Sequence, residues 1–258
     1  MAPQADKIRS FFDSEAFEYA RNREQQYSFQ SQKKLVLELL DGVEGARGRA
    51  LDLGCGPALM EQALLERGYE VWGIDASAQM IGHGKARLAR HALRERCHLA
   101  VGDIEHIACA DGFYDAVISM GVLEYLPDYA PALREMHRAL KSGGVALLTV
   151  PSRISAYHFA RGVYNSGVAL VRRALGRRGP AGAAPGANRC VPWQLDRQLA
   201  QAGFRKLAGR ACNFIFFPLH DNHPQASLAL NRRLSPLAAS PLGLLLGAQY
   251  IVKAQKKG

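Results

Sequence analysis

The stretch Leu-Asp-Leu-Gly-Cys-Gly-Pro-Ala, residues 51–58, decides the fold of this 258-residue chain. A largely apolar approach begins at Arg49, and two glycines, Gly54 and Gly56, follow one residue apart. Glycine adopts positive φ easily and has no Cβ, so the backbone N–H groups of such a turn can approach a ligand closely. The stretch therefore predicts a β-strand, a tight turn and a helix beginning at Pro57, which is the layout of a nucleotide-binding α/β domain.

Two kinds of ligand compete for this turn. The dinucleotide fingerprint is G-x-G-x-x-G/A, and Leu59 occupies the position of its third glycine. Asp52 lies just before the turn, where its carboxylate would repel the pyrophosphate of a dinucleotide. A cationic or hydroxyl-rich ligand is therefore favoured, and a turn that binds no ligand remains the other alternative.

The turn resembles the first motif of class I S-adenosylmethionine-dependent methyltransferases, which commonly reads D/E-x-G-x-G-x-G. Ala58 stands where that family often has its third glycine. Three further features follow in the family's order, each after an apolar, strand-like segment: Asp75, then Gly102-Asp103-Ile104, then Met120–Asp128. Asp75 lies about twenty residues beyond the turn, the spacing at which a carboxylate meets ribose hydroxyls. The resemblance covers about residues 45–151.

The resemblance implies a role for each feature. Asp75 accepts from the ribose hydroxyls, Asp103 accepts from the adenine amino group, and Ile104 packs on the adenine ring. The segment Met120–Asp128 lines the methyl-transfer pocket. The implied donor-binding residues are Asp52, Gly54, Cys55, Gly56, Asp75, Ala76, Met80, Asp103, Ile104, Met120 and Gly121. S-adenosyl-L-methionine is the expected cofactor and S-adenosyl-L-homocysteine its product.

The order of the apolar segments predicts an α/β fold. The resemblance implies a Rossmann-like three-layer sandwich, with a mostly parallel sheet, an antiparallel edge strand, an N-terminal helical cap and an insertion after the fifth strand. The expected division is a helical cap at 1–44, a donor-binding core at 45–152, an Arg-rich helical insertion at 153–190 and a segment completing the sheet at 191–258. From the cap, Tyr19, Arg21, Arg23 and Tyr27 are expected to reach the donor's carboxylate.

The net charge of +10 is unevenly distributed. Residues 51–150 hold nine basic and thirteen acidic side chains, whereas residues 151–258 hold sixteen basic side chains and only Asp196 and Asp221 as acids. Within residues 151–189 an apolar helical pattern is combined with seven arginines and no acid. That combination is typical of a helix at a membrane interface. It predicts weak peripheral contact with anionic lipid, with a plain solvated surface as the alternative.

The five cysteines are odd in number and include no C-x-x-C pair, which favours a reducing compartment over a disulfide or zinc framework. His220, Asp221 and His223 are too few for a convincing metal site, so we expect no metal. The sequence begins without an apolar signal segment, and its longest apolar tract is too short and too broken to span a bilayer. We expect a cytoplasmic protein with at most peripheral membrane contact.

Methyl transfer from a sulfonium requires that the acceptor be aligned with the methyl–sulfur bond and, for a hydroxyl acceptor, that a proton be removed. His158, His220 and His223 are candidate bases and Tyr125 is a candidate positioning group; the predicted catalytic residues are His158 and Tyr125. The expected acceptor is a small, hydrophobic molecule methylated at oxygen. Met120–Asp128 and the insertion after the fifth strand look most like those of quinone or polyketide methyltransferases.

Two alternative functions remain open. The basic C-terminal half is compatible with nucleic-acid methylation. However, Ser119-Met120-Gly121-Val122 stands where base amino methyltransferases carry Asn/Asp-Pro-Pro-aromatic, and the Pro-Cys nucleophile of cytosine-C5 methylation is missing. The second alternative is a catalytically silent scaffold that binds the donor and acts through a partner. Turnover would exclude it.

Overall fold

The computed structural model describes residues 3–41, 48–174, 188–216, 219 and 223–257. The strands are β1 (Arg49–Leu53), β2 (Glu70–Asp75), β3 (Cys97–Val101), β4 (Tyr114–Met120), β5 (Leu140–Pro151), β6 (Phe204–Cys212) and β7 (Gln249–Lys256). The α-helices are α1 (Pro3–Asn22), α2 (Tyr27–Asp41), α3 (Glu61–Glu66), α4 (Ala78–Leu88), α5 (Ala130–Ala139), α6 (Ala156–Ala174), α7 (Pro192–Gln201), α9 (Pro224–Leu234) and α10 (Pro241–Leu246). The short 3₁₀ helices are η1 (Arg23–Gln25), η2 (Arg94–Arg96), η3 (Leu123–Tyr125) and η4 (Ser235–Ala239).

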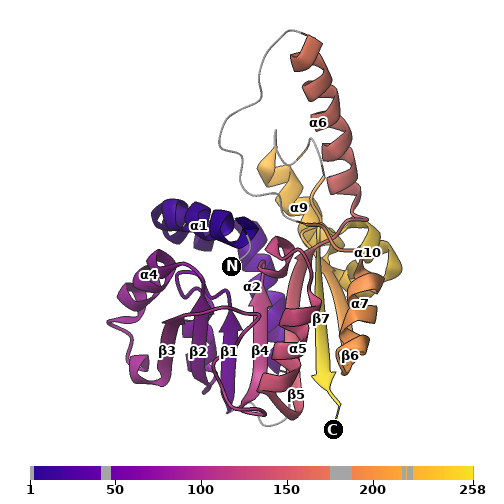
Figure 1. The fold of residues 1–258 in the computed structure, drawn as a ribbon. Helices are drawn as coiled ribbons and strands as arrows, with labels where there is room; N and C mark the ends of the chain where they lie inside the picture. Colours follow the sequence, from indigo (N-terminus) through magenta and orange to yellow (C-terminus); the bar gives the residue numbers. More distant parts are fainter. Residues whose placement is uncertain (1–2, 42–47, 175–187, 217–218, 220–222, 258) are drawn as a thin grey trace.

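The strands form one sheet in the order β3-β2-β1-β4-β5-β7-β6 (Figure 1). The pairs among β1 to β5 are parallel, and β7 runs antiparallel to both β5 and β6. The predicted mostly parallel sheet with an antiparallel edge pair is therefore confirmed, with β7 one position in from the edge that β6 forms. The chain order reverses between β1 and β4, and in such sheets ligands bind beyond the carboxyl ends of the strands at this point.

Alternate residues of the central strands enter two separate cores, as the two-residue period of a strand requires. Leu51 and Leu53 pack in one core with residues of α5 and α7, whereas Ala50 packs in the other with residues of α2, α3 and α4. Both cores consist of buried side chains, mostly aliphatic with a few aromatic ones. Helices therefore cover both faces of the sheet, and the expected three-layer sandwich is confirmed.

Two helices lie away from these layers. Figure 1 shows α1 above the upper ends of β1, β2 and β3, beside α4, whereas α6 projects away from the sheet beyond the end of β5. The predicted N-terminal helical segment is interrupted at η1, so it forms two helices, α1 and α2. Helix α1 lies beyond the carboxyl ends of the parallel strands, where ligands bind in sheets of this kind. Helix α2 packs on the sheet.

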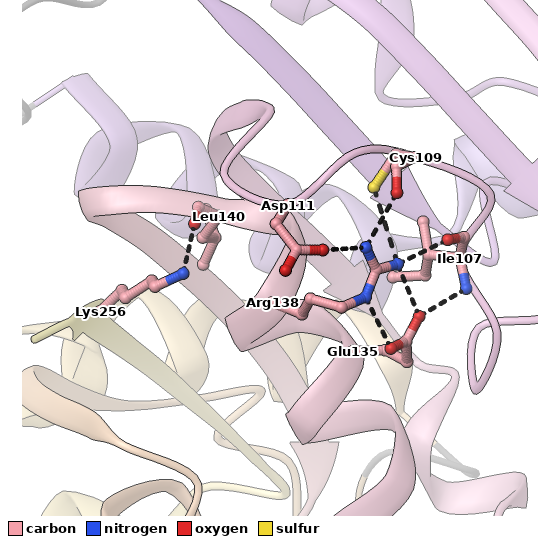
Figure 2. Close-up of polar contacts among 7 residues, drawn as sticks. All are labelled: Ile107, Cys109, Asp111, Glu135, Arg138, Leu140 and Lys256. Carbon is pink, nitrogen blue, oxygen red and sulfur yellow. Dashed lines mark hydrogen bonds and ion pairs between the residues drawn. The ribbon is translucent and has the colours of Figure 1, made fainter.

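The loop between β3 and β4 is fastened to α5 by Arg138 (Figure 2). Its guanidinium donates to the carbonyl oxygens of Ile107 (2.7 Å) and Cys109 (2.8 Å), and to the carboxylates of Glu135 (2.9 Å) and Asp111 (2.8 Å). Glu135 in turn accepts from the backbone N–H of Ile107 at 2.8 Å. This cluster ties the segment that follows β3, and hence the end of that strand, to the helical layer.

Candidate active site

The glycine turn lies at the point where the sheet order reverses. Gly54, Gly56 and Ala58 all have positive φ, at 69°, 54° and 57°. A Cβ on Gly54 would lie 2.3 Å from Cγ2 of Val122, in the segment that follows β4. The turn is therefore pressed against the end of β4 with no space for a side chain at Gly54.

The helix after the turn begins later than predicted. The sequence predicts a start at Pro57, but α3 begins at Glu61, and residues 56–60 form turns. The prediction is wrong because Ala58 adopts a left-handed conformation, which a right-handed helix cannot contain. The N–H of Ala58 donates instead to the carbonyl oxygen of Cys55 at 3.2 Å.

Asp75, at the end of β2, is bound by backbone groups on both sides. Its Oδ2 accepts from the N–H of Gly56 at 2.9 Å and its Oδ1 from the N–H of Ser77 at 2.8 Å. Burial raises the pKa of this carboxyl, the two N–H groups lower it, and the nearby Asp13 raises it further. The carboxylate is thus held against the glycine turn, and the exposed Ala76 follows it.

Ser77 connects this corner to the helix above it. Its hydroxyl accepts from the N–H of Met80 at 3.1 Å, as the cap of α4, and donates to Oδ1 of Asp13 on α1 at 2.6 Å. The side chain of Met80 is buried. Asp13 of the N-terminal helix α1 is thus hydrogen-bonded to Ser77, two residues after Asp75 in the sequence.

Asp103 and Ile104 follow β3, beside the end of β2. The N–H of Gly102 donates to the carbonyl oxygen of Asp75 at 3.0 Å, which brings the two strand ends together. Oδ1 of the exposed Asp103 accepts from the N–H of Glu105 at 2.9 Å, and the Ile104 side chain is buried. An exposed acid and an apolar side chain therefore stand side by side next to the Asp75 corner.

The segment after β4 begins with the half-buried Met120 and with Gly121, whose φ is 70°. The N–H of Gly121 donates to Oγ1 of Thr149 on β5 at 3.0 Å. A Cβ on Gly121 would lie 3.5 Å from Oε1 of Glu124, so this carboxyl stands directly against the segment. Met120 and Gly121 thus occupy the β4 side of the reversal point, opposite Gly54.

Glu124, which was not singled out from the sequence, lies near Arg23, one of the cap residues predicted from it. Glu124 is 7% exposed, and burial raises its pKa to about 7 despite its own backbone N–H and the nearby Arg23. Its Oε2 and the Nε of Arg23 are both buried without a hydrogen-bond partner among the described residues. The Glu124 carboxyl and the Arg23 guanidinium therefore lie near each other, and each has a buried polar atom that lacks a hydrogen bond among the described residues.

Tyr19 joins this pair to the glycine turn. Its ring lies 3.9 Å from the position that a Cβ on Gly56 would take, and the Arg23 guanidinium lies 5.6 Å from the ring centroid. Burial raises the pKa of Tyr19, and Glu124 and Asp75 act in the same direction. The cap side chains Tyr19 and Arg23 therefore lie over the turn, while Arg21 forms an exposed ion pair with Glu18. The Tyr27 hydroxyl accepts a hydrogen bond from the side-chain amide of Asn231 on α9.

Asp52 and Cys55 are buried on the inner side of the turn. Burial raises the pKa of Asp52 well above its usual range, the charges of Glu61 and Asp75 raise it further, and Lys33 opposes them. Glu61 is fully buried, and burial raises its pKa to about 7. Glu61 was not singled out from the sequence, because nothing in the sequence shows that its charge lies near that of Asp52.

The two predicted catalytic residues lie in different elements. Tyr125, in η3, stacks edge to face on Phe12 of α1 at 5.2 Å, and burial raises its pKa to about 12. His158, in the first turn of α6, has its Nε2 3.1 Å from the carbonyl oxygen of Ala248, and burial lowers its pKa. Of the other candidate bases, His223 is exposed before α9, and His220 lies outside the described residues.

Comparison with known proteins identifies relatives of the central region. Residues 51–148 match the family described as methyltransferase domain. Over 129 residues the chain is 38% identical to a ubiquinone biosynthesis O-methyltransferase of Alkalilimnicola ehrlichii, covering 48% of this chain and 50% of that protein. Over 114 residues it is 34% identical to a malonyl-[acyl-carrier protein] O-methyltransferase of Salmonella typhimurium, covering 44% and 42%. The matches thus span about half the length of these curated relatives.

The fold as a whole is also shared with solved structures. A magnesium protoporphyrin IX methyltransferase from Synechocystis, solved with bound S-adenosylhomocysteine, superimposes with a TM-score of 0.63. The match covers 98% of this chain and 100% of that chain at 15% identity. At that identity the likeness concerns the fold alone.

Proposed function

The core of this chain, residues 51–148, belongs to the class I S-adenosylmethionine-dependent methyltransferases, and we propose that the whole chain transfers the donor's methyl group to an oxygen atom of a small, hydrophobic acceptor. The O-methyltransferase names of the matched relatives support oxygen as the methylated atom. Acceptors of the nucleic-acid type lack such support, because neither matched relative is named for one.

The observation that carries the proposal is the pair of unsatisfied buried charges above the turn. The donor's amino-acid end bears an ammonium and a carboxylate, and it needs one protein group of each sign. The free Oε2 of Glu124 suits the ammonium and the free Nε of Arg23 suits the carboxylate. Glu124 stands against Gly121. Arg23 lies over the ring of Tyr19, which in turn lies beside Gly56. Both groups are therefore near the turn, and the residues present fit the two charges of the donor.

The remaining donor contacts follow from the positions of the strand ends. We assign the ribose hydroxyls to Asp75, with Ala76 and Met80 beside them, and the adenine to Asp103 and Ile104. Gly54, Cys55, Gly56, Met120 and Gly121 bound the space between these groups, and Asp52 supports the turn from inside. The bound donor supplies a methyl group on a sulfonium, already activated for transfer, so alignment of the acceptor is the main task left to the chain.

His158 is the proposed base. When Nε2–H donates to the carbonyl oxygen of Ala248, Nδ1 carries the lone pair and can take the acceptor's proton. Its lowered pKa keeps the ring neutral at pH 7, as a base requires. Tyr125, whose pKa is raised to about 12, stays protonated and is proposed to donate a hydrogen bond that positions the acceptor.

We also propose weak peripheral contact with anionic membranes through α6. Phe159 is 74% exposed and Leu170 is 70% exposed, on a helix that projects away from the sheet (Figure 1). An apolar helix face on a strongly basic half of the chain suits an anionic lipid surface, where a hydrophobic acceptor would also dissolve. Within the part of the chain that the structure describes, no helix has the length and apolarity to cross a bilayer.

Donor binding and turnover test the proposed function. Calorimetry should detect binding of S-adenosylhomocysteine and none of NAD. Asp75→Ala should weaken donor binding by about 1.5–3 kcal/mol, the range for hydrogen bonds to a charged group. Asp41→Ala is the matched control: Asp41 forms an ion pair with Arg67 at the surface, away from the carboxyl ends of the strands, and its loss should leave the affinity unchanged.

Three outcomes contradict the proposal: tight binding of NAD, equal donor affinity in the Asp75→Ala variant and wild type, or no methyl transfer to any hydroxylated aromatic or acyl acceptor. The last result, with donor binding intact, would favour the silent scaffold.

A further inference from the structure

A cavity of about 550 Å³ opens beside the proposed methyl-transfer region. The loop after η3 contributes Pro127, Asp128 and the buried Tyr129 to its lining. The segment between β5 and α6 contributes Arg153, and the chain entering α7 contributes Arg189. None of these belongs to the donor-binding residues assigned above. The volume is in the range of pockets that hold small molecules.

Backbone pairing fixes the two arginines next to each other. The N–H of Arg153 donates to the carbonyl oxygen of Cys190 at 2.8 Å, and the N–H of Cys190 donates to that of Pro151 at 2.9 Å. Asn188, also in the lining, donates from its backbone to the carbonyl oxygen of Glu124 at 2.7 Å and from its side chain to that of Leu126 at 2.9 Å. The segment that carries Arg189 is thus hydrogen-bonded to Met120–Asp128, the segment expected to line the methyl-transfer pocket.

The positive charge of these arginines is not balanced locally. Neither guanidinium forms a hydrogen bond or ion pair with any residue that the structure describes. Asp128 is the acid of the lining, and its Oδ1 already accepts from the N–H of Ala130. Asp196, on the neighbouring α7, has both oxygens occupied by Lys206 and Tyr250. Two guanidiniums therefore face the cavity against one partly engaged carboxylate.

The cavity is also within electrostatic reach of the proposed base. After burial, the charge of Arg189 is the largest influence that lowers the pKa of His158. His158 lies in the first turn of α6, five residues after Arg153 in the sequence. A group bound between the arginines would thus lie near the imidazole.

We propose that this cavity binds an anionic group of the methyl acceptor, a carboxylate or a phosphate, through Arg153 and Arg189. The guanidinium fork matches the paired oxygens of either anion, and the proline and tyrosine of the lining suit an apolar body attached to it. The assignment of the bound molecule as the acceptor rests on the proposed function; the anion site itself does not. The substrate class is therefore a small hydrophobic molecule with one acidic group.

Binding of paired probes to the full chain tests the proposal. Benzoate and phenyl phosphate represent the two anions, and benzamide is the neutral counterpart of benzoate. Each is titrated by calorimetry at constant ionic strength, up to about 20 mM, with S-adenosylhomocysteine present. At least one anion should bind about tenfold or more tightly than benzamide, as expected for charge-assisted hydrogen bonds. Which of the two binds better distinguishes a carboxylate from a phosphate ligand.

Variants place the binding at the cavity. Arg153→Gln and Arg189→Gln should each remove most of the anion preference, and Arg189→Lys should retain part of it because the charge remains without the fork. Arg197→Gln is the matched control, since Arg197 is an exposed arginine of α7 outside the lining. It should leave anion binding as in wild type.

The anion site and the proposed function fail separately. Equal binding of benzoate, phenyl phosphate and benzamide, or an anion preference that survives Arg153→Gln and Arg189→Gln, overturns the anion site. Intact S-adenosylhomocysteine binding in the same samples would then leave the proposed function standing. Absence of S-adenosylhomocysteine binding would instead overturn the proposed function, whatever the anions do.

Discussion

At the scale of single residues, Gly54 determines the shape of the turn most directly. Its φ of 69° is strained for any residue with a side chain, and a Cβ added at this position would lie only 2.3 Å from Cγ2 of Val122. Gly54→Ala should destabilise the fold by about 2–4 kcal/mol, from the left-handed conformation and the overpacking together. Urea denaturation measures the loss. Gly82→Ala, at an open position in α4, should instead stabilise by about 0.5–1 kcal/mol. A loss below about 0.5 kcal/mol for Gly54→Ala would contradict the turn geometry.

Glu124 should make donor affinity depend on pH. Burial holds its pKa at about 7, so the carboxylate that would bind the donor's ammonium is mostly protonated in mildly acidic solution. S-adenosylhomocysteine affinity should therefore rise about tenfold between about pH 6 and about pH 8, in proportion to the ionised fraction. Glu124→Gln cannot ionise and should show weaker, nearly flat binding. An equal rise in the variant would assign the titration to another group, of which Glu61 is the first candidate.

Some residues of the site could be predicted from the sequence and others could not. Asp75, Gly54 and Gly56 are fixed by local rules, because spacing after a strand and positive φ are properties of short segments. Glu124 and Glu61 are ordinary acids in the sequence. What distinguishes them is burial against groups of other elements, which depends on how those elements pack. The roles of the predicted donor-binding residues and of His158 and Tyr125 stay predictions.

At the scale of elements, the cluster around Arg138 holds the loop between β3 and β4 (Figure 2). Arg138→Lys keeps the charge but cannot reach two carbonyls and two carboxylates at once. We expect a loss of about 1–3 kcal/mol, because the cluster is partly exposed and its ion pairs are weakened by solvent. Thermal unfolding measures it. Arg134→Lys, at an exposed position on the same helix, is the control, and an equal effect of both variants would mean that the cluster adds nothing.

Strands were more predictable than helix ends. The apolar, strand-like segments that precede Asp75 and Gly102 are β2 and β3, because a strand is a short apolar run bounded by polar residues or glycine. The start of α3 was misplaced because the conformation of Ala58 is imposed by the turn and its packing, while alanine itself favours a helix. The break between α1 and α2 at η1 could not be predicted, because no glycine or proline occurs there in the sequence.

At the scale of the whole molecule, the acidic donor-binding core and the basic C-terminal half divide the work of the proposed reaction. The core residues proposed to recognise the donor include the acids Asp75, Asp103 and Glu124, which suit a cationic, hydroxyl-rich molecule. The basic half holds the cavity with Arg153 and Arg189, and it holds α6. A hydrophobic acceptor with an acidic group would meet complementary charge on this second half. The division into four segments, which this contrast suggests, stays a prediction.

The same contrast predicts how the molecule meets a membrane. If α6 docks, its exposed Phe159 and Leu170 enter the interface while basic side chains meet anionic headgroups, each contributing about 1 kcal/mol that salt screens. Flotation should therefore recover the chain with anionic vesicles but not with neutral ones, and less at high salt. Phe159→Ser with Leu170→Ser should abolish recovery, whereas Leu242→Ser, a half-exposed leucine on α10, should not. Replacing Arg172, Arg173, Arg177 and Arg178 with Ser should also abolish it. No recovery at low salt would leave α6 as a solvated helix.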